Sequence, residues 1–468
     1  MNYHPAYSNQ LKMKALSFIG TIALLPLISC GDPKPEERKQ PNFVIIIADD
    51  AAWSDNGAYG NNTIKTPNIN KLAEEGVVFN NAFLTTSSCS PSRCSILTGR
   101  YPHSTSAPEL HMPLPADQLL FAGELQKVGY YTAVAGKYHI GPKRPEFDTI
   151  YGGKPSGCEY WVEALQNRPN DKPFFLWLAA SDPHRPYIEN IIPEPHLPED
   201  VIVPPFLPDN DSTRKDLAMY YDEISRLDDY LGQVMNELKR QGVDEETMVI
   251  YMSDNGMPFP RAKTRLYDSG IKTPFIVRWP AKLRKGTTDV LISSIDIAPT
   301  LCELADAGIS ESYQGLSFVP VLEDYTTNGR EYIASEHNWH DYQAHERAIR
   351  THDYLYIRNA YPELNASPPA DAVNSITYQE MIKLYHAGEL NEFQLDCFIE
   401  PRTAEELYDL KNDPYQFNNL AENSDYSNQL NEMRTILDNW IVKFNDEIPQ
   451  QPTPDKFTRW TGKRIENH

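Results

Sequence analysis

Two pairs of adjacent oxygen-bearing side chains could hold a metal ion. Asp49 and Asp50 follow one apolar run of the sequence, and Asp254 and Asn255 follow another. Carboxylate and amide oxygens suit hard cations, and no Cys/His spacing typical of zinc lies near them, so they predict a Ca²⁺ or Mg²⁺ site. Neighbouring side chains on a strand point to opposite faces, so both aspartates can share one ion only just past a strand end. A turn or a helix cap is the alternative for Asp49 and Asp50.

Cys89 is the third chemical candidate. It lies five residues before Cys94, in the stretch SSCSPSRCSILTGR, at a predicted helix start. Residues five apart diverge around a helix axis, so a disulfide between the two is disfavoured and we expect Cys94 to be a packed thiol. A thiolate nucleophile is a second interpretation of Cys89, because a helix N-terminus lowers the pKa of a thiol. Chemical modification of Cys89 is a third, and the motif discussed below favours it.

Four apolar runs, each followed by polar or ionisable residues, predict the strands that position these groups. The run at 43–48 is nearly continuous and β-branched, as in a strand buried on both faces of a sheet. Ligands of open α/β sheets bind at the carboxyl ends of the strands, so the polar residues after all four runs can converge on one site. The runs and their polar ends are 43–48 with Asp49-Asp50, 132–135 with Gly136-Lys137-Tyr138-His139, 174–180 with Ser181-Asp182-Pro183-His184, and 248–252 with Ser253-Asp254-Asn255-Gly256.

Helical periodicity and a change of pattern near residue 345 define the remaining organisation. Apolar residues spaced three or four apart from Leu217 to Leu238 predict a long covering helix, and those from Leu430 to Phe444 predict a second. Residues 346–359 alternate as strands do. We therefore predict an α/β fold in which a central, mostly parallel mixed sheet is sandwiched by helices, followed by a smaller α+β domain with an antiparallel sheet. The predicted domains are 41–345 and 346–468.

The charge balance limits the classes of partner. Of 468 residues, 43 are basic and 65 acidic, which gives a formal net charge of −22. Such a charge argues against a nucleic-acid partner and against electrostatic adhesion to anionic lipid. An anionic substrate would therefore need positive groups concentrated locally around it.

The first 40 residues are typical of an export signal. Lys12 and Lys14 precede an apolar run at 15–28 that is too short to span a bilayer comfortably and is shaped like a secretory core. The run ends in Leu-Ile-Ser-Cys, which resembles a bacterial lipobox and implies cleavage before Cys30 and lipid attachment to it. A buried core helix is the alternative. We predict a signal peptide at 1–30, a tether at 31–40, and an exported bacterial lipoprotein of the periplasm or outer membrane, held to the membrane by its lipid.

The residues around Cys89 closely resemble a known family signature. Cys89-Ser90-Pro91-Ser92-Arg93, followed by Leu97-Thr98-Gly99-Arg100, is similar to the signature of the type I sulfatases of the alkaline phosphatase superfamily. The resemblance extends from Asn42 to about Glu447 and includes GKYHIG, DPHRP, SDNG and KTRLYDSG. It implies an alkaline-phosphatase-like fold and a maturation enzyme that converts Cys89 to formylglycine.

The resemblance also implies a role for each candidate residue. One hydroxyl of the hydrated formylglycine attacks sulfur while bound to Ca²⁺, and the second lets the sulfated intermediate collapse to the aldehyde. Taken singly, each lysine or histidine could equally be a surface lysine or a core histidine. The implied roles are metal binding by Asp49, Asp50, Asp254, Asn255 and residue 89, orientation of the diol by Arg93, sulfate binding by Lys137, His139 and Lys263, and protonation of the leaving group by His184.

The predicted substrate is a sulfated carbohydrate. The motifs look closer to the N-sulfoglucosamine sulfohydrolase branch than to the aryl or choline sulfatases, and bacterial members of that branch resemble enzymes acting on algal polysaccharides such as ulvan. A segment rich in histidine and aromatic residues could bind sugar, because aromatic rings stack on sugar faces and imidazoles bind hydroxyls or anions. A hairpin buried between the domains is the alternative. The candidates for substrate binding are His337, Trp339, His340 and His345.

Two other functions fit the same fold. A phosphomonoesterase or phosphodiesterase of the superfamily usually uses a Ser or Thr nucleophile and two metals with several His ligands, whereas this sequence offers Cys89 and one oxygen-rich site. A glycan-binding lipoprotein that has lost catalysis is the other alternative.

Overall fold

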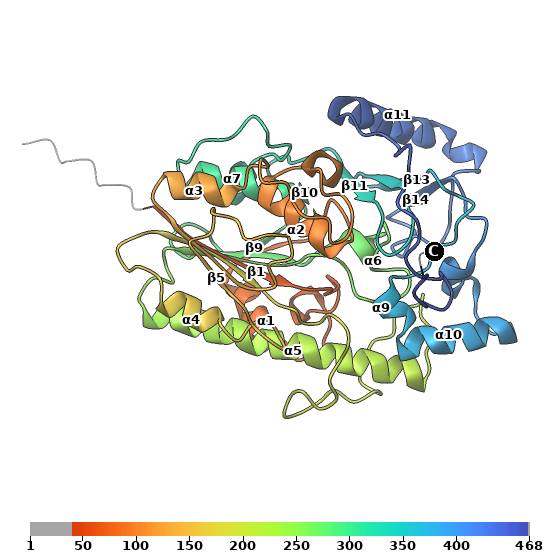
Figure 1. The fold of residues 1–468 in the computed structure, drawn as a ribbon, viewed down its shortest axis with the longest axis horizontal. Helices are drawn as coiled ribbons and strands as arrows, with labels where there is room; N and C mark the ends of the chain where they lie inside the picture. Colours follow the sequence, from red (N-terminus) through yellow and green to blue (C-terminus); the bar gives the residue numbers. More distant parts are fainter. Residues whose placement is uncertain (1–39, 467–468) are drawn as a thin grey trace, which may run out of the picture. The chain divides into compact units, whose positions relative to one another are not determined.

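The computed structural model describes residues 40–466, and an eight-stranded mixed sheet forms the core of this part (Figure 1). The predicted signal peptide, Cys30 and nearly all of the tether lie outside the described residues. Within 40–466, no helix combines the length and apolar character needed to cross a membrane. The strands, in their order across the sheet, are β5 (Thr149–Tyr151), β4 (Tyr131–Gly136), β6 (Phe174–Ala179), β1 (Asn42–Ala48), β7 (Thr247–Ser253), β8 (Phe275–Arg278), β2 (Val77–Phe79) and β9 (Gly286–Thr288).

The four strands predicted from the sequence are neighbours in this sheet. β1 pairs in parallel with both β6 and β7, and β4 pairs in parallel with β6. β8 is antiparallel to β7 and to β2, which makes the sheet mixed. Because β4, β6, β1 and β7 run in the same direction, their carboxyl ends meet at one edge, as predicted.

Side chains of β1 alternate between two hydrophobic cores, one on each face of the sheet. Val44 and Ile46 pack with α1, α4 and α5, whereas Ile45 and Ile47 pack with α2, α3 and α7 (Figure 1). Burial on both faces explains why the strand sequence is a continuous apolar run. The helices are α1 (Pro67–Glu75), α2 (Cys89–Thr98), α3 (Phe121–Lys127), α4 (Trp161–Gln166), α5 (Asp211–Arg240) and α7 (Ile297–Leu304).

The long predicted helix is α5, and its start follows a clear capping signal. The side chain of Asn210 accepts a hydrogen bond from the backbone N–H of Thr213 at 3.0 Å. This bond satisfies one of the free N–H groups of the first turn. The apolar stripe from Leu217 to Leu238 then lies buried against the sheet.

A second, four-stranded antiparallel sheet follows, in the order β11-β12-β13-β14. Trp440 and Leu437 of α11 pack on one face of this sheet, and Leu266 and Ile271 pack on the other. The prediction of a small antiparallel sheet is confirmed. The elements are β11 (Ile333–His337), β12 (Glu346–Arg350), β13 (Tyr354–Asn359), β14 (Glu405–Asp409) and α11 (Ser427–Phe444).

The two sheets do not separate at residue 345. β11 precedes that position yet belongs to the small sheet, and contacts join residues from Gln40 onward into one compact unit. The small sheet therefore begins upstream of the predicted boundary, because its first strand pairs with β12 across the intervening loop. The remaining α-helices and strands of the described chain are β3 (Ala82–Phe83) paired with β10 (Ile292–Ser293), α6 (Asp268–Ile271), α8 (Val319–Glu323), α9 (Ala370–Val373) and α10 (Ile376–Ala387).

Candidate active site

Asp49 and Asp50 lie directly after β1, both with fully buried side chains. Asp50 has a φ of 78°, the left-handed region that non-glycine residues seldom adopt and that Asp tolerates better than most. A residue in this conformation interrupts the alternation of the strand. The two neighbouring carboxylates can therefore face the same pocket, as the sequence required for a shared ion.

Asp254 and Asn255 lie directly after β7, the parallel neighbour of β1, and are also fully buried. The backbone N–H of Asp50 donates to Oδ1 of Asp254 at 3.2 Å. Nδ2 of Asn255 donates to Oδ1 of Asp50 at 2.6 Å. The two acidic segments, about 200 residues apart in the sequence, are thus bonded to one another.

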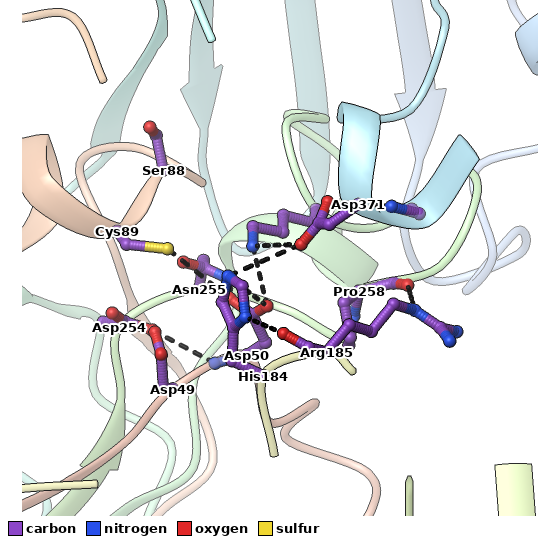
Figure 2. Close-up of polar contacts among 12 residues, drawn as sticks. Asp49, Asp50, Ser88, Cys89, His184, Arg185, Asp254, Asn255, Pro258 and Asp371 are labelled. Carbon is purple, nitrogen blue, oxygen red and sulfur yellow. Dashed lines mark hydrogen bonds and ion pairs between the residues drawn. The ribbon is translucent and has the colours of Figure 1, made fainter. Parts of the chain in front are cut away.

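Cys89 is the first residue of α2, and its Sγ lies 3.6 Å from Oδ1 of Asp50. Arg93 lies one helical turn later, so its guanidinium faces the same acidic groups. Its Nε donates to Oδ2 of Asp254 at 2.8 Å, and its terminal nitrogen lies 3.4 Å from Oδ1 of Asp49. The helix start predicted at Cys89 therefore faces the two acidic pairs (Figure 2).

Two lysines bring further positive charge to the carboxylates. Lys137 follows β4 and donates to Oδ2 of Asp49. Lys263 is almost completely buried, and its Nζ lies 2.7 Å from Oδ2 of Asp50. Buried charges need partners of opposite sign, and three cations here oppose the three carboxylates of Asp49, Asp50 and Asp254. The site concentrates positive groups in a strongly acidic chain, as an anionic substrate would require.

His184 completes the group from the segment after β6. Its Nδ1 lies 2.6 Å from the carbonyl oxygen of Arg185, so Nδ1 carries a proton that it donates there. Nε2 then faces the acidic groups, at 4.0 Å from Oδ2 of Asp50 and 3.5 Å from Oδ2 of Asp371 (Figure 2). Asp371 lies on the short helix α9, and no motif in the sequence distinguishes it.

The arrangement fits a divalent metal ion. Oδ1 of Asn255 is buried and has no hydrogen-bond partner among the described residues, which leaves a lone pair for a cation. Ligand atoms of Asp49, Cys89 and Asp254 all lie within 4.8 Å of one another. Oxygen donors of this kind suit Ca²⁺ or Mg²⁺.

Burial governs the protonation of the site. It raises the pKa of Asp254 to about 7, against the opposing effect of Arg93. It likewise raises the pKa of the Cys89 thiol well above its ordinary value, although Lys137 and Lys263 act in the other direction. The pKa of Asp49 lies well below its usual range, because Lys137 and other cations outweigh the effect of burial. A bound divalent cation would stabilise the ionised forms of all three groups.

His139 lies beyond β4 with a left-handed φ of 48°. Its Nε2 lies 2.8 Å from Nδ1 of His111, a residue that no sequence motif indicates. Burial and nearby Lys137 lower the pKa of His139 to about 2, so the ring is neutral. Nδ1 of His139 is buried without a hydrogen-bond partner in the described chain.

The four candidates for sugar binding do not gather around this site. His337 lies 3.4 Å from Oε1 of Glu346, and His345 lies 3.3 Å from the carbonyl oxygen of Glu447. The cavity beside His337 and His340 has a volume of only about 20 Å³, which suffices for one water and not for a sugar ring.

These contacts engage His337 and His345 with partners outside the acidic cluster. His340, by contrast, lies close enough to Lys263 and Asp371 for their charges to act on its ring. Nδ1 of His340 lies 2.7 Å from Oγ of Ser88, the residue before Cys89, and supports the start of α2. Trp339 is half-buried, and its indole N–H donates to the carbonyl oxygen of Pro454 at 2.8 Å. The histidines and aromatic residues of this segment are close in the sequence, but their rings contact different parts of the fold.

All five cysteines of the described chain are free and buried. The prediction that Cys89 and Cys94 form no disulfide is confirmed. Cys94 packs in the core with Ile96 and Leu97.

A model of the sulfatase family matches residues 41–307, more than half of the chain. The chain belongs to the sulfatase family. A second family model, N-sulphoglucosamine sulphohydrolase, C-terminal, matches residues 261–365. This match includes Lys263 and the small sheet's first strands, so the sulfatase resemblance extends beyond the large sheet.

Individual relatives give the same family. An ulvan-active sulfatase of Formosa agariphila is 30% identical and covers 96% of this chain and 85% of that protein. Human N-sulphoglucosamine sulphohydrolase is 29% identical, and the match covers 87% of this chain and 91% of that protein. A solved structure in complex with its substrate D-glucosamine-2-N,6-O-disulfate has the same fold, with a TM-score of 0.69, 20% identity and coverage of 88% and 99%.

Proposed function

We propose that this sulfatase removes sulfate groups from sulfated carbohydrates and that residue 89 is the nucleophile, as formylglycine. The observation that carries the proposal is the position of Cys89, which faces Asp50 beside the buried cations Lys263 and Arg93. A tetrahedral sulfate ester needs an activated oxygen, cations around its oxygens and an acid for the leaving group. Each of these requirements has a candidate within the same cluster.

When present, formylglycine would supply a hydrated carbonyl as nucleophile, and a divalent ion, which we propose is Ca²⁺, would act as a Lewis acid beside it. Asp49, Asp50, Asp254 and Asn255 would hold that ion. The guanidinium of Arg93 holds the carboxylates of Asp49 and Asp254 in place and puts positive charge near residue 89.

Lys137 and Lys263 would bind the sulfate oxygens. Their ammonium groups already face the site, paired with Asp49 and Asp50. Fixed cations in a buried pocket stabilise charge more strongly than the same groups in water. In the tautomer in which Nδ1 of His111 donates to Nε2 of His139, the neutral ring of His139 would offer its Nδ1–H as a hydrogen-bond donor.

His184 would protonate the departing oxygen or nitrogen. Its Nδ1–H is held by the Arg185 carbonyl, which fixes the ring and leaves Nε2 aimed at the cluster. An acid at this place matters most for sugar leaving groups, because alkoxides are poor leaving groups without a proton.

The sulfated carbohydrate is proposed from the relatives. The proteins named above are an ulvan-active sulfatase and an N-sulphoglucosamine sulphohydrolase, and their names indicate that they act on ulvan and on N-sulphoglucosamine. We therefore propose algal or glycosaminoglycan oligosaccharides as the substrate class.

The decisive experiment is peptide mapping by mass spectrometry after co-expression with a formylglycine-generating enzyme, together with a desulfation screen. We expect the Cys89 peptide to carry an aldehyde and at least one defined ulvan, carrageenan or heparan oligosaccharide to lose sulfate. Cys89→Ala should bind the same oligosaccharide without turning it over. Phosphate release without sulfate release, or full activity of Cys89→Ala, would contradict the proposal.

We also propose that the protein is an exported lipoprotein, on the basis of the lipobox that ends at Cys30. Expression in a bacterial host with metabolic labelling by a fatty acid tests this. Wild type should carry the label in the membrane fraction, whereas Cys30→Ser should be unlabelled. Equal labelling of both would refute the anchor.

A further inference from the structure

Asp371 is the acidic residue of the cluster that faces solvent. About 24% of its side chain is exposed, whereas the side chains of Asp49 and Asp254 are completely buried. Its Oδ2 lies 3.2 Å from Nζ of Lys263 and 3.5 Å from Nε2 of His184 (Figure 2). Asp371 thus touches one proposed sulfate ligand and the proposed acid, on the side where the leaving group must lie.

The ammonium of Lys263 fills the space between Asp371 and Asp50. Its Nζ lies 2.7 Å from Oδ2 of Asp50 and 3.2 Å from Oδ2 of Asp371. A second metal ion at this place would have to displace a buried lysine. The position therefore suits a residue that contacts substrate better than one that binds metal.

Asp371 also lines a cavity of about 350 Å³, large enough for a sugar ring. This cavity shares Arg185 and Pro186 with a second cavity, of about 300 Å³, that contains Asp49, Lys137 and His184. The two cavities therefore adjoin at the segment that carries His184. Lys137 and His184 line one of them, and Asp371 lines the other.

The walls of the Asp371 cavity have the mixed character of a sugar site. Asn374 and Ser375 offer polar groups, and Met219 and Ile376 offer apolar surface. Tyr187, a further wall residue, has a buried hydroxyl without a hydrogen-bond partner in the described chain. Sites for small polar ligands typically combine such apolar walls with a few hydrogen-bonding groups.

The other carboxylate of this cavity is already neutralised. Asp216 accepts two hydrogen bonds from Arg185, both at 2.8 Å, and a third from Thr377. Oδ2 of Asp371, by contrast, contacts Lys263 and His184, which are groups that a sulfate ester would engage in the proposed function. Asp371 is thus the carboxylate of this cavity that can bind a polar group of the substrate.

We propose that Asp371 is a specificity-determining residue that accepts a hydrogen bond from a hydroxyl or ammonium group adjacent to the scissile sulfate. The inference rests on the proposed function, since it takes the sulfate to bind at Lys263 and the leaving group to lie at His184. The cavity that Asp371 lines holds the sugar that carries this sulfate. A second sulfate group at that adjacent position would lie close to the Asp371 carboxylate. Repulsion between the two negative charges would then weaken binding.

The expected discrimination follows from electrostatics. Two like charges about 5 Å apart near a protein surface repel strongly enough for about a hundredfold effect in affinity. Solvent screening at a partly exposed carboxylate reduces this to about tenfold. A hydrogen-bond donor at the same position gains a charge-assisted bond instead.

Catechol monosulfate and catechol disulfate test the inference without knowledge of the natural sulfate position, because they differ only in the neighbouring group. The measurement is kcat/KM for both probes, with phenyl sulfate as a third. Wild type should prefer the monosulfate, and the neutral variant Asp371→Asn should reduce that preference about tenfold. Asp371→Ala should lower monosulfate activity to the level of phenyl sulfate. Glu380→Gln, which removes a carboxylate from the neighbouring helix outside the cavity, should change neither the probe preference nor the activity on the monosulfate.

Binding of inorganic sulfate, measured by calorimetry, supplies a readout without turnover. Asp371→Asn should bind sulfate several-fold more tightly than wild type, because Asp371 no longer competes for Lys263 and His184. An unchanged probe preference and unchanged sulfate affinity in a folded Asp371→Asn would overturn the inference alone. Failure of the wild-type enzyme to desulfate any sulfated probe or oligosaccharide would overturn the proposed function, and this inference with it.

Discussion

At the scale of single residues, the chemistry of the site depends on which atoms of each side chain already have a hydrogen-bond partner. Nδ1 of His184 is engaged by the Arg185 carbonyl, so only Nε2 can act on a substrate. Oδ1 of Asn255 is unengaged in the described structure, whereas its Nδ2 binds Asp50. His184 therefore has one ring nitrogen that can act on a substrate, and Asn255 has one oxygen that can bind a cation.

His184→Ala should reduce turnover according to the leaving group. A general acid contributes about a hundredfold or more when the leaving group is a sugar alkoxide, and little when it is an activated phenolate. We therefore expect a loss of about a hundredfold on a sulfated sugar and less than about tenfold on 4-nitrophenyl sulfate. Steady-state kcat on both substrates measures this, and equal losses would exclude His184 as the acid.

Asn255→Leu should abolish stabilisation by Ca²⁺. Ligand binding to the native state adds about 2.7 kcal/mol at a free concentration about 100 times Kd, so Ca²⁺ should raise the Tm of the wild type. The leucine variant should show no such rise, whereas Asn255→Asp, which keeps an oxygen at this position, should retain it. Differential scanning fluorimetry with added Ca²⁺ or chelator gives the result. A full Ca²⁺ response in Asn255→Leu would show that the ion binds elsewhere.

At the scale of elements, the loop after β7 is held by close backbone contacts. The N–H of Gly256 donates to the carbonyl of Gly270 at 2.9 Å. A Cβ at Gly256 would lie 2.0 Å from the carbonyl oxygen of Ser269, a separation that no side chain can adopt without moving the backbone. The loop that carries Asp254 and Asn255 is therefore fixed against the start of α6.

Gly256→Ala should displace both proposed metal ligands of this loop, Asp254 and Asn255. We expect a loss of about 1–3 kcal/mol of stability, as for other overpacked sites, and a weaker response of Tm to Ca²⁺. Gly152→Ala is the matched control, since an added Cβ there has no neighbour within 4 Å. Thermal unfolding of both variants with and without Ca²⁺ compares them, and identical behaviour would contradict the packing argument.

At the scale of the whole described chain, residues just after α2 pack against the C-terminal helix α11. Trp440 is almost fully buried, and its ring lies 5.0 Å from that of Tyr101 in an edge-on arrangement. His103 lies nearby, with Nδ1 at 2.6 Å from Oε1 of Glu336 and Nε2 at 3.0 Å from the carbonyl oxygen of Phe444. These contacts connect the segment that follows Cys89 to the small sheet.

Trp440→Ala should destabilise the protein as a whole. Truncation of a buried Trp typically lowers the free energy of unfolding by about 3–5 kcal/mol. Val442→Ala on the same helix is the control, because Val442 is 77% exposed and such surface changes stay within about 0.5 kcal/mol. Denaturant unfolding of both variants measures the difference, and a small effect of Trp440→Ala would mean that α11 is not part of the cooperative unit.

The same junction should make stability depend on pH. Burial opposes the charge on His103, but Glu336 and Asp446 outweigh it and raise the pKa of His103, while Arg347, paired with Asp446, also lies at this junction. Because the folded pKa exceeds the unfolded value of about 6.5, the stabilisation is complete below that pH and is lost as pH rises through the folded pKa. His103→Gln should therefore cost about 1.5 kcal/mol at low pH and less once the pH exceeds the folded pKa of His103. Unfolding midpoints of the wild type and of His103→Gln, measured across this pH range, test the prediction. A stability difference between the two that grows as the pH rises would contradict it.

The amino-acid sequence by itself determined the local parts of this protein. The buried strand at 42–48, the amphipathic helix at 211–240 and the helix start at Cys89 follow from residue patterns of short range. The acidic pairs lie at strand ends because the apolar runs stop there, and their convergence follows from the rule for parallel sheets. The family resemblance, through the Cys89 signature and the motifs GKYHIG, DPHRP and KTRLYDSG, suggested the proposed roles of Arg93, Lys137, His184 and Lys263.

Only the tertiary structure decided what reaches the site from far along the chain. Asp371 enters through α9, and His111 reaches His139 from a loop, yet neither has a local pattern that marks it. Conversely, His337 and His345 lie close together in the sequence but contact different partners, because strand pairing in the small sheet directs each side chain separately. Local periodicity fixes which residues form an element, whereas the packing of elements against one another fixes which side chains meet.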